Sequence, residues 1–468
     1  MLLLGAACGG GTPAAGPGQA QSVAPAPPVV SPAAPGAVTL AAPAPPAAAT
    51  DWPGYHRDAA RTGFDPGTPP VSRPAGAWRA RTDAAVYASP LVVGGLVVAA
   101  SERNTVYGFE LTTGRQRWSR QLGPPVPRSA LPCGNIDPLG ITGTPAYDAG
   151  SRTLFVVTTT PDGPRIRHTL VALDPRTGAV RGSRPADPPG QDPTVENQRG
   201  ALAVTAGHVL VPYGGHLGDC GDFHGYVVGV PTSLRGDLLV NRAGARGEAG
   251  EWAAGGVAVD AEGFAYVANG NGRATSGAYD GSDAVLKLDP RRGLRQVDFL
   301  GERDWADANA ADRDLGSASP LLVAGYVWQQ GKSDKSYLRP QRDLGGLQDR
   351  PVTTGACASQ FGGAAAHGSV LFASCTDGVR AVGVLPGGGV RLGWKAPAAV
   401  NGSPVVGGGA VWALDVRAGR LHALAEASGR DLGVVDVGDV TRFATPALSG
   451  GFVLVPTTTG VTAVRVAS

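Results

Sequence analysis

The sequence predicts an all-β fold made of repeated four-stranded sheets, and three features of the 468-residue chain support this prediction. First, 71 glycines and 40 prolines are too many for a largely helical protein, because both residues break helix interiors. Second, short Val-rich segments alternate with glycine or asparagine turns, as strands and hairpins do. Third, one sequence unit recurs about every 49 residues.

The clearest copy of this unit lies in residues 88–118. Its strands are expected at 88–95, 96–100, 105–111 and 115–118, separated by polar or glycine turns. Such a segment forms one antiparallel meander.

The opening strand of the unit recurs along the chain, as does its third strand near Asp174, near Asp289 and, more weakly, near His422. The eight candidate opening strands are 88–95, 143–148, 200–204, 255–259, 319–323, 362–365, 402–407 and 444–448. A single meander cannot bury both of its faces, whereas eight meanders packed around an axis can. The sequence therefore predicts an eight-bladed β-propeller of four-stranded antiparallel blades over residues 51–468.

The last unit contains only three strands and ends near 464–466, whereas residues 77–80 form a strand without a unit of its own. We expect this N-terminal strand to become the outer strand of the last blade. Ring closure of this kind removes an exposed sheet edge.

Residues 1–50 contain no charged and no aromatic side chain. Residues 1–8 resemble the end of a bacterial lipoprotein signal, in which small residues precede the lipidated cysteine, here Cys8. We interpret them as a truncated signal whose charged n-region would lie upstream. The Ala/Pro/Gly-rich residues 9–50 are expected to form a disordered stalk, because they cannot bury enough apolar surface to fold.

Charge argues against one class of partner, and hydropathy argues against a membrane-spanning helix. The formal net charge is +2 and no basic block is present, so we expect no nucleic-acid partner. No run of 18 apolar residues occurs, so no membrane-spanning helix is predicted.

The repeats resemble the pyrroloquinoline-quinone-like (PQQ-like) repeat of quinoprotein-type β-propellers. Residues 108–118 follow that family's pattern Ala-x-Asp-x-x-Thr-Gly-x-x-x-Trp, with Glu110 at the acidic position, and the copies at Asp174 and Asp289 keep the aspartate but lack the tryptophan. Residues 51–63 are similar to the segment that precedes the first blade in such proteins. The resemblance implies the fold and also a family in which many members bind no quinone, like the propeller lipoprotein of outer-membrane assembly.

The resemblance does not carry the dehydrogenase chemistry over to this chain. Quinone alcohol dehydrogenases require two adjacent cysteines against the cofactor, a Ca²⁺ site and an aspartate base. No two adjacent cysteines occur here. The sequence predicts no cofactor, and PQQ with Ca²⁺ enters only under the alternative that the chain is a quinoprotein dehydrogenase.

Four cysteines follow Cys8, and an exported protein would oxidise them. Three pairings are possible. We predict Cys133–Cys220 and Cys357–Cys375, because the first pair falls in loops at the same end of the ring and the second pair flanks one inner strand. Metal ligation is disfavoured because no Cys-x-x-Cys spacing is present, and free thiols are expected only in a cytosolic protein.

Polar residues are dense in the loops around the first predicted disulfide. If these loops share one end of the ring, they form a funnel of the kind over which propellers place ligands. The candidate funnel residues are Asn135, Asp137, Asn197, Gln198, Asp219, Asp222, His224, Asn269, Asn271, Asp304 and Trp305. They could bind a polar ligand or carbohydrate, Asp219, Asp222 and Asp280 could hold Ca²⁺, or the acids and amides could simply cap turns.

The sequence predicts no catalytic residue, because no hydrolase or metalloprotease motif is present. We expect an extracytoplasmic, lipid-anchored propeller that acts as a binding or scaffold module of the cell envelope, or a secreted one if Cys8 is not lipidated. Its partner would be an envelope protein or a polar small molecule, and the chain would be a monomer. The alternatives are the quinoprotein dehydrogenase and a carbohydrate-binding or carbohydrate-active propeller, and the nature of any metal stays open.

Overall fold

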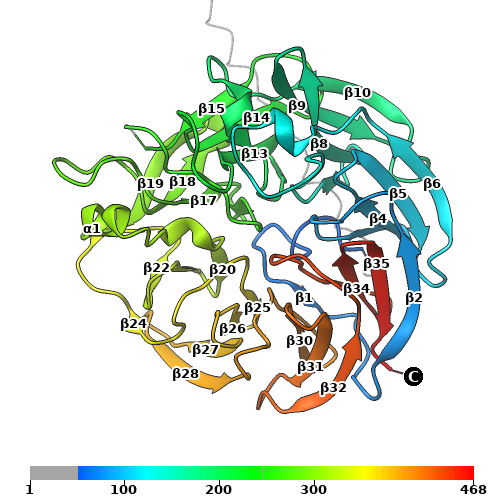
Figure 1. The fold of residues 1–468 in the computed structure, drawn as a ribbon. Helices are drawn as coiled ribbons and strands as arrows, with labels where there is room; N and C mark the ends of the chain where they lie inside the picture. The colour runs from blue at the N-terminus through cyan, green and yellow to red at the C-terminus, as the bar shows by residue number, and fades with distance from the viewer. Residues whose placement is uncertain (1–50, 245, 468) are drawn as a thin grey trace, which may run out of the picture. The chain divides into compact units, whose positions relative to one another are not determined.

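The Val-rich segments form short strands that the glycine turns fold into eight antiparallel sheets arranged around one axis (Figure 1). The computed structural model describes residues 51–244 and 246–467. Within these residues the prediction of an eight-bladed β-propeller is confirmed. The predicted lipidation site Cys8 and the predicted stalk 9–50 lie outside the described residues.

Blades 1 to 4 follow one another around the ring, each running from an inner to an outer strand. Blade 1 contains β3 (Leu91–Val93), β4 (Leu96–Ala100), β5 (Thr105–Glu110) and β6 (Gln116–Gln121). Blade 2 contains β7 (Ala146–Asp148), β8 (Thr153–Asp162), β9 (Arg165–Leu173) and β10 (Val180–Pro185). Blade 3 contains β12 (Ala203–Thr205), β13 (His208–Gly215), β14 (Tyr226–Pro231) and β15 (Leu239–Arg242), with β11 (Glu196–Asn197) added on β13. Blade 4 contains β16 (Ala258–Val259), β17 (Ala265–Asn269), β18 (Ala284–Asp289) and β19 (Arg295–Glu302).

Blades 5 to 8 complete the circle. Blade 5 contains β20 (Leu321–Val323), β21 (Tyr326–Gln330), β22 (Lys335–Pro340) and β24 (Thr353–Thr354). Blade 6 contains β25 (Ala365–His367), β26 (Val370–Ala373), β27 (Arg380–Val384) and β28 (Val390–Lys395). Blade 7 contains β29 (Val405–Gly407), β30 (Ala410–Asp415), β31 (Arg420–Ala425) and β32 (Asp431–Asp436). Blade 8 contains β33 (Ala447–Ser449), β34 (Phe452–Thr457), β35 (Gly460–Arg465) and β2 (Ala75–Arg81).

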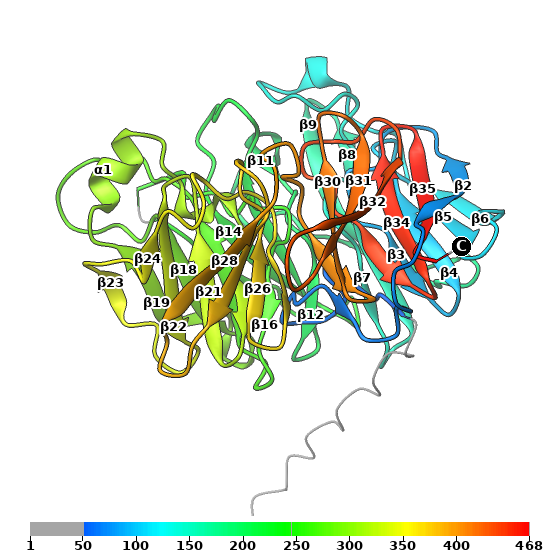
Figure 2. The same cartoon turned by 90° about the horizontal axis from the view of Figure 1, so that it is seen from below.

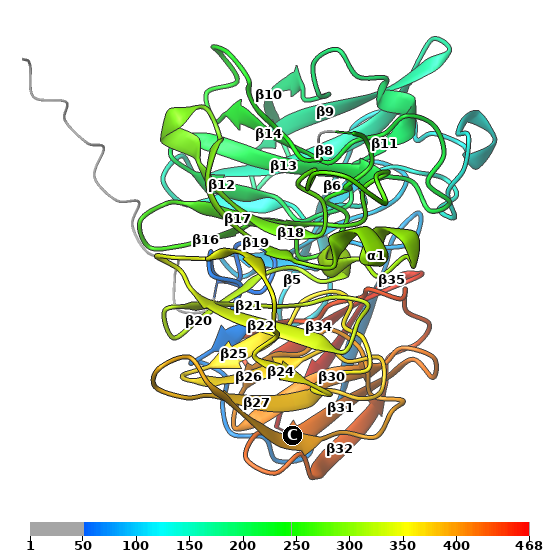
Figure 3. The same ribbon diagram turned by 90° about the vertical axis from the view of Figure 1, so that its left-hand side faces the viewer.

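Helices are short in the described part of the chain. The α-helix α1 (Trp305–Ala310) lies in the connection from blade 4 to blade 5 and protrudes beside these blades (Figures 1 and 3). The 3₁₀ turns are Arg128–Ala130, Pro193–Val195, Pro290–Arg292 and Leu315–Ser317. None of the described helices has the length and apolar composition needed to cross a membrane.

The ring is closed by the N-terminal strand, as the sequence predicted. β2 pairs antiparallel with β35, with Trp78 opposite Ala463 and Ala80 opposite Val461. The Trp78 ring lies against Gly114 of blade 1, and its Nε1 donates to the carbonyl oxygen of Leu111 at 2.9 Å. The N-terminal strand β2 therefore completes the sheet of blade 8, and its Trp78 connects this blade to blade 1.

The same contact recurs at two further blade junctions. Trp118 lies against Gly178, and Trp394 lies against Gly429. A Cβ at Gly178 would come within 2.4 Å of the Trp118 ring, and the φ angle of this glycine is 69°. The turn therefore requires glycine both for its left-handed backbone and for the close approach of the ring.

Two features of the sheets were not predicted. β23 (Gly346–Gln348) leaves blade 5 and pairs parallel with β19 as a fifth strand of blade 4, so blade 5 keeps only the two-residue β24 as its outer strand. β1 (Phe64–Asp65) pairs parallel with β29 on the axial side of blade 7. Both depend on pairing between segments that are not neighbours in sequence.

The apolar core lies between the blades. Middle strands such as β5 are buried on both faces, whereas outer strands such as β6 expose all their side chains except Trp118. Facing blades share apolar clusters: Phe155 and Leu170 of blade 2 pack with Val209 and Tyr213 of blade 3. Each meander thus buries its second face only because a neighbour covers it.

The lead-in residues 51–68 occupy the lower part of the ring near its axis (Figure 2). Their backbone exchanges hydrogen bonds with the inner strands of blades 1, 2, 4, 5, 6 and 7, through Val92, Tyr147, Val259, Leu322, Ala366 and Val406. The side chains of Arg61 and Tyr55 reach Leu202 and Thr445, which lead into the inner strands of blades 3 and 8. We call residues 51–68 the axial plug.

Candidate functional site

Two sets of loops gather at one end of the ring, which we call the upper end (Figure 2). One set joins the outer strand of a blade to the inner strand of the next, and the other joins the second strand of a blade to its third. The axial plug lies at the opposite, lower end. The predicted funnel residues lie in these upper-end connections or directly beside them.

Three aromatic side chains meet near the axis at the upper end. Trp252, Phe361 and Phe443 have ring centroids 6.2–6.4 Å apart and come from the loops that lead into blades 4, 6 and 8. Loops from non-adjacent blades can meet in this way only close to the axis. All three rings are partly exposed. We call them the axial aromatic cluster.

Cationic groups lie over each ring of the cluster. The guanidinium of Arg199 is 4.3 Å from the centroid of Phe443, that of Arg442 is 4.4 Å from Phe361, and the ammonium of Lys332 is 5.9 Å from Trp252. At these distances the negative faces of the rings attract the cations.

The three cations differ in their partners. Lys332 forms ion pairs with Asp312 and Asp314, whereas Arg199 and Arg442 form no hydrogen bond or ion pair with any other residue in the described ranges. Burial lowers the pKa of Arg199 to about 10, which keeps the guanidinium charged at neutral pH. Arg199 is partly exposed and Arg442 is exposed, so their N–H donors are left to water or to a ligand.

The opposite side of the cluster is acidic. Asp314 accepts from the backbone N–H of Asn271 at 2.6 Å, and Asp312 accepts from the Asn271 side chain at 3.1 Å. Partial burial, and then the neighbouring Asp314, raise the pKa of the exposed Asp219. Asp312 and Asp314 therefore hold Lys332 and Asn271 in place beside the cluster.

Buried carboxyl groups are another feature of the upper end. Burial raises the pKa of Glu102 to about 7 and that of Glu196 to about 8, and it raises the pKa values of Glu251, Asp283 and Glu302. Each of these five groups has at least one carboxylate oxygen without a hydrogen-bond partner among the described residues. All five lie in, or directly beside, upper-end loops.

Four predicted funnel residues serve the local structure. Asn269 fixes its own loop by accepting from Ala284 N–H and donating to the Gly281 carbonyl, both at 2.8 Å. Gln198 donates to the Gly200 carbonyl at 2.7 Å. Trp305 is buried in α1 against Tyr279, and Asp304 forms ion pairs with Lys335 and Arg313. These contacts match the interpretation that polar loop residues hold turns.

The other predicted residues spread over the upper end. His224 is buried, its ring nitrogens lie 2.7 and 3.0 Å from Arg242 Nη2, and burial followed by Arg242 lowers its pKa. Asp222 is exposed and pairs with Arg273 at 3.0 Å. Asn135 and Asp137 are exposed near Cys133, and Asn197 is buried in β11. The residues that come close to the axial cluster are Asp219 and Asn271.

The structure does not bring together a metal-binding set. Within residues 51–244 and 246–467, no group of three or more His, Cys, Asp or Glu side chains is arranged to hold a metal ion. Asp222 pairs with Arg273, and Asp280 accepts from the Ser282 backbone and hydroxyl. The residues present therefore do not fit the Ca²⁺ site of a quinone dehydrogenase, and no reaction step through such a site follows.

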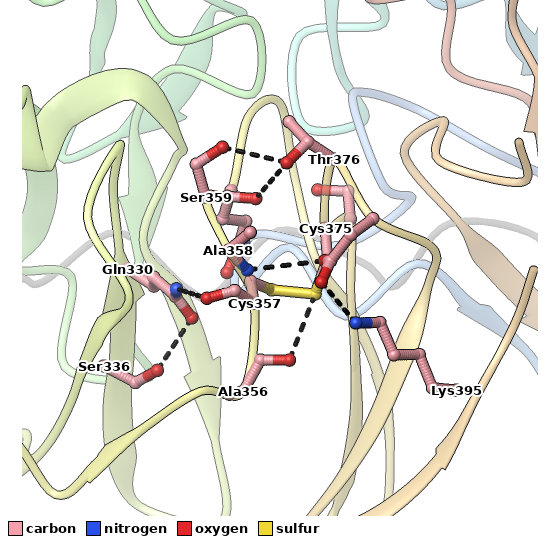
Figure 4. Close-up of a disulfide and its surroundings, with 12 residues drawn as sticks. Gln330, Ser336, Ala356, Cys357, Ala358, Ser359, Cys375, Thr376 and Lys395 are labelled. Carbon is pink, nitrogen blue, oxygen red and sulfur yellow. Dashed lines mark hydrogen bonds and ion pairs between the residues drawn. A yellow bond between two sulfur atoms is a disulfide. The ribbon is translucent and has the colours of Figure 1, made fainter. Parts of the chain in front are cut away.

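Both cysteine pairs form disulfides in the structure, in the pairing expected from the sequence. Cys133–Cys220 joins the loop before blade 2 to a loop of blade 3, with the Cα atoms 6.1 Å apart. Cys357–Cys375 joins the loop before blade 6 to a turn within blade 6, with the Cα atoms 5.0 Å apart (Figure 4). Both bonds stiffen upper-end loops.

The axial aromatic cluster and its arginines were missed by sequence reasoning. Each aromatic residue is single in its loop, so no spacing connects the three. One signal was present: Trp252, Phe361 and Phe443 each come one to three residues before the opening strand of a blade, where the chain reaches the axis.

The eight blades around one axis define the fold of the described residues as an eight-bladed β-propeller. More particularly, residues 75–213 match the family model described as outer membrane protein assembly factor BamB. No curated protein sequence matches the chain.

Solved structures resemble the chain over most of its length. The quinohemoprotein alcohol dehydrogenase from Comamonas testosteroni is 16% identical over 89% of this chain and 80% of its own, with a TM-score of 0.63. A europium-containing methanol dehydrogenase is 15% identical over 88% and 91%, with a TM-score of 0.64. BamB from Moraxella catarrhalis is 17% identical over 84% and 97%, with a TM-score of 0.54. At these identities the likeness shows the fold alone.

Proposed function

We propose that the chain is an extracytoplasmic binding module of the cell envelope that engages its partner through the upper end of the propeller. The observation that carries this proposal is the contrast between the two ends of the axis. At the lower end the axial plug is bonded to the inner strands and leaves a hollow of about 370 Å³ that is lined by Asp51 and Asp58 as well as by Arg57 and Arg61. The upper end instead presents partly exposed aromatic rings, and arginines without protein partners in the described chain. Exposed aromatic and arginine side chains are the groups that dominate binding energy at interfaces.

Two observations support an extracytoplasmic location. The structure contains two disulfides, which persist in oxidising compartments and are rare in the cytosol. Part of the chain also matches the family named for BamB, an outer membrane assembly factor. We propose in addition that Cys8 is lipidated and anchors the chain to the membrane. Mass spectrometry of the protein from its native host should detect a lipid on Cys8, and an unmodified Cys8 would contradict the anchor.

Site-specific photo-crosslinking in the native host tests the binding surface. A photoreactive residue at Asp219 or at Thr459, both exposed at the upper end, should give a crosslinked adduct of one defined mass. The matched control is Glu262, which is exposed in a lower-end turn of blade 4 and should give none. Adducts formed only from Glu262, or no adduct from either upper position, would contradict the proposal.

We also propose that the module works without PQQ or Ca²⁺. The support is the lack of adjacent cysteines in the sequence and of a metal-binding set among the described residues. Purified protein should show no dye-linked alcohol oxidation after PQQ and Ca²⁺ are added. Activity that a chelator abolishes would establish the dehydrogenase alternative instead.

A further inference from the structure

A cavity of about 230 Å³ opens at the upper end between blades 6, 7 and 8. Its walls include Phe361 and Phe443 of the axial aromatic cluster, together with Arg417 and Arg442. Thr376 and Asn401 add a hydroxyl and an amide. We call this cavity the arginine pocket.

The charge of the arginine pocket is unbalanced. No aspartate or glutamate lines it. Arg417 and Arg442 are exposed and form no hydrogen bond or ion pair with another residue of the described chain. Two guanidinium groups in one cavity without a carboxylate leave their donors for water or for a bound anion.

A second basic cavity, in blade 4, differs in its acidic lining. That cavity, of about 630 Å³, is lined by four cationic side chains, those of Lys287, Arg291, Arg292 and Arg342, and by two carboxylates, those of Asp289 and Asp298. Asp289 lies 3.0 Å from Arg291 and 3.6 Å from Arg292, so both of these arginines have a carboxylate partner within the cavity. In the arginine pocket no such group is present.

The aromatic walls of the pocket favour an anion that carries an apolar group. The ring centroids of Phe361 and Phe443 are 6.3 Å apart, and the Arg442 guanidinium lies 4.4 Å from the first and 5.3 Å from the second. Contact with the rings positions the guanidinium fork, which binds a carboxylate with two parallel hydrogen bonds. An apolar group attached to the carboxylate would rest against the rings.

The size of the pocket limits the ligand. Its 230 Å³ is below the range of about 300–1,000 Å³ that is typical of sites for drug-sized molecules. The pocket therefore suits one group of side-chain size and not a multi-ring cofactor.

The Cys357–Cys375 disulfide holds one wall of the pocket in place (Figure 4). Beside it, Thr376 N–H donates to the Ser359 carbonyl at 2.9 Å, and the two hydroxyls of these residues lie 2.9 Å apart. Phe361 N–H donates to the Ser374 carbonyl at 3.4 Å. The wall that carries Phe361 and Thr376 is thus fixed before a ligand arrives, which lowers the entropic cost of binding.

We propose that the arginine pocket binds a carboxylate carried on a short aromatic or apolar stem. The proposal rests on the function proposed above and names the chemical group recognised at the upper end. Two sources supply this chemistry: a free small aromatic acid and the C-terminal residue of a polypeptide.

Calorimetric titration with three probes tests the ligand chemistry. The probes are phenylacetate, Gly-Gly-Phe with a free C-terminal carboxylate, and the same tripeptide with a C-terminal amide. The free tripeptide should bind at least about tenfold more tightly than the amide, because a charge-assisted hydrogen bond is lost. Binding of phenylacetate as well would assign the site to small acids, and binding of the tripeptide alone would assign it to polypeptide ends. Equal binding of acid and amide, or no saturable binding of any probe, would overturn the proposal.

Variants locate the binding. Arg442→Gln and Arg417→Gln should each lower the binding affinity for the free tripeptide or for phenylacetate by about tenfold. The matched control Arg292→Gln changes the blade 4 cavity and should leave affinity unchanged. The double variant Cys357→Ser/Cys375→Ser, if circular dichroism shows it folded, should weaken binding because the Phe361 wall loosens. Unchanged affinity in the double variant Arg417→Gln/Arg442→Gln, or an equal loss in Arg292→Gln, would overturn the assignment.

The upper-end binding module and the arginine pocket can be contradicted independently of each other. Crosslinks from Asp219 and Thr459 without carboxylate binding would retain the upper-end module and overturn the arginine pocket. Carboxylate binding that depends on Arg442, without any crosslink, would retain the pocket and overturn the envelope partner.

Discussion

Arg61 and Arg199 lie at opposite ends of the same axis and are satisfied differently. Burial lowers the pKa of each to about 10. Arg61 donates to the carbonyl oxygens of Tyr55, Leu202 and Val257 at 2.7–2.9 Å. Arg199 has only the Phe443 ring against it and no acceptor among the described residues. Arg61 therefore bonds the axial plug to blades 3 and 4, whereas the N–H donors of Arg199 have no protein acceptor in the described chain.

The contrast extends beyond these two residues. In the axial plug, Asp58 accepts from Thr62 N–H at 3.0 Å and Asp65 accepts from the Thr68 hydroxyl at 2.7 Å. At the upper end, five buried carboxyl groups each keep an oxygen without a partner among the described residues. In the plug, nitrogen atoms of Trp52, His56 and Arg57 also lack a hydrogen bond there. The contrast between the two ends therefore concerns the carboxyl groups: Asp58 and Asp65 have donors, whereas each of the five acids of the upper end keeps an unpaired acceptor atom.

Removing the disulfides should have the largest effect on the upper end. In the chain-entropy model, loss of Cys133–Cys220 costs about 4.5 kcal/mol and loss of Cys357–Cys375 about 3 kcal/mol, because the first closes a longer loop. Urea denaturation of the two Cys→Ala double variants measures both. A larger loss for Cys357–Cys375 would show that local packing, and not loop length, decides the contribution.

Exchanging the two arginines for methionine tests the comparison directly. Arg61→Met should lower the free energy of unfolding by about 4 kcal/mol, because three buried carbonyl groups lose their donor. Arg199→Met should change it by less than about 1 kcal/mol, because no hydrogen bond is lost and the apolar stem still covers Phe443. Equal losses in urea denaturation would remove the distinction between the two ends.

The buried carboxyl groups predict a pH dependence. Glu102 has an ordinary pKa of 4.5 that burial raises to about 7 in the folded state. Below pH 4.5 the group is protonated in both states and costs nothing. As pH rises from 4.5 to about 7, the unfolded state ionises first, so stability falls.

Glu102→Gln should therefore be more stable than the wild type at pH 8 by up to about 3 kcal/mol, and the difference should vanish at pH 4. Denaturation curves at both pH values measure it. The exposed Glu262→Gln is the control and should show no such difference. A Glu102→Gln variant that is no more stable than the wild type at pH 8 would contradict the raised pKa of Glu102. The wild-type profile alone is no test, because the lowered pKa values of the buried His56 and His216 make stability rise with pH up to about 6.5.

The smallest effect concerns the tip of the axial plug. Tyr55 OH lies 3.2 Å from Thr445 Oγ1, and the residue is otherwise enclosed. Tyr55→Phe keeps the ring and should cost about 1 kcal/mol in thermal or urea unfolding. A loss no greater than that of an exposed substitution such as Arg79→Gln would show that packing alone holds the plug.

The blades were predictable because their signal is local. Each opening strand combines small residues with a short apolar run, and all eight candidates overlap with observed inner strands, although 362–365 shares only Ala365 with β25. The closing strand could be inferred because the last unit was one strand short. The transfer of β23 to blade 4 could not, because its pairing with β19 is set by tertiary contacts and not by residue pattern.

The site was predictable only as a region. Sequence reasoning placed the candidate funnel in the loops of the upper end, where the axial aromatic cluster also lies. Asn269 and Gln198, however, bond to backbone groups nearby, as such residues usually do in loops. The aromatic cluster depends on contacts between Trp252, Phe361 and Phe443, whose loops are far apart in sequence. The role of the axial plug was hidden for the same reason: Tyr55 meets Thr445 across 390 residues.

The axial plug also bears on how the ring comes apart. In an open array of repeats each unit touches only its neighbours, so unfolding can begin at one end and spread. Here a single segment is bonded to strands, or to the residues leading into them, of all eight blades in the described chain. When one blade unfolds, the axial plug loses its bonds to that blade and holds the other blades less firmly. Probes placed in different blades should therefore report one cooperative unfolding transition with the same midpoint.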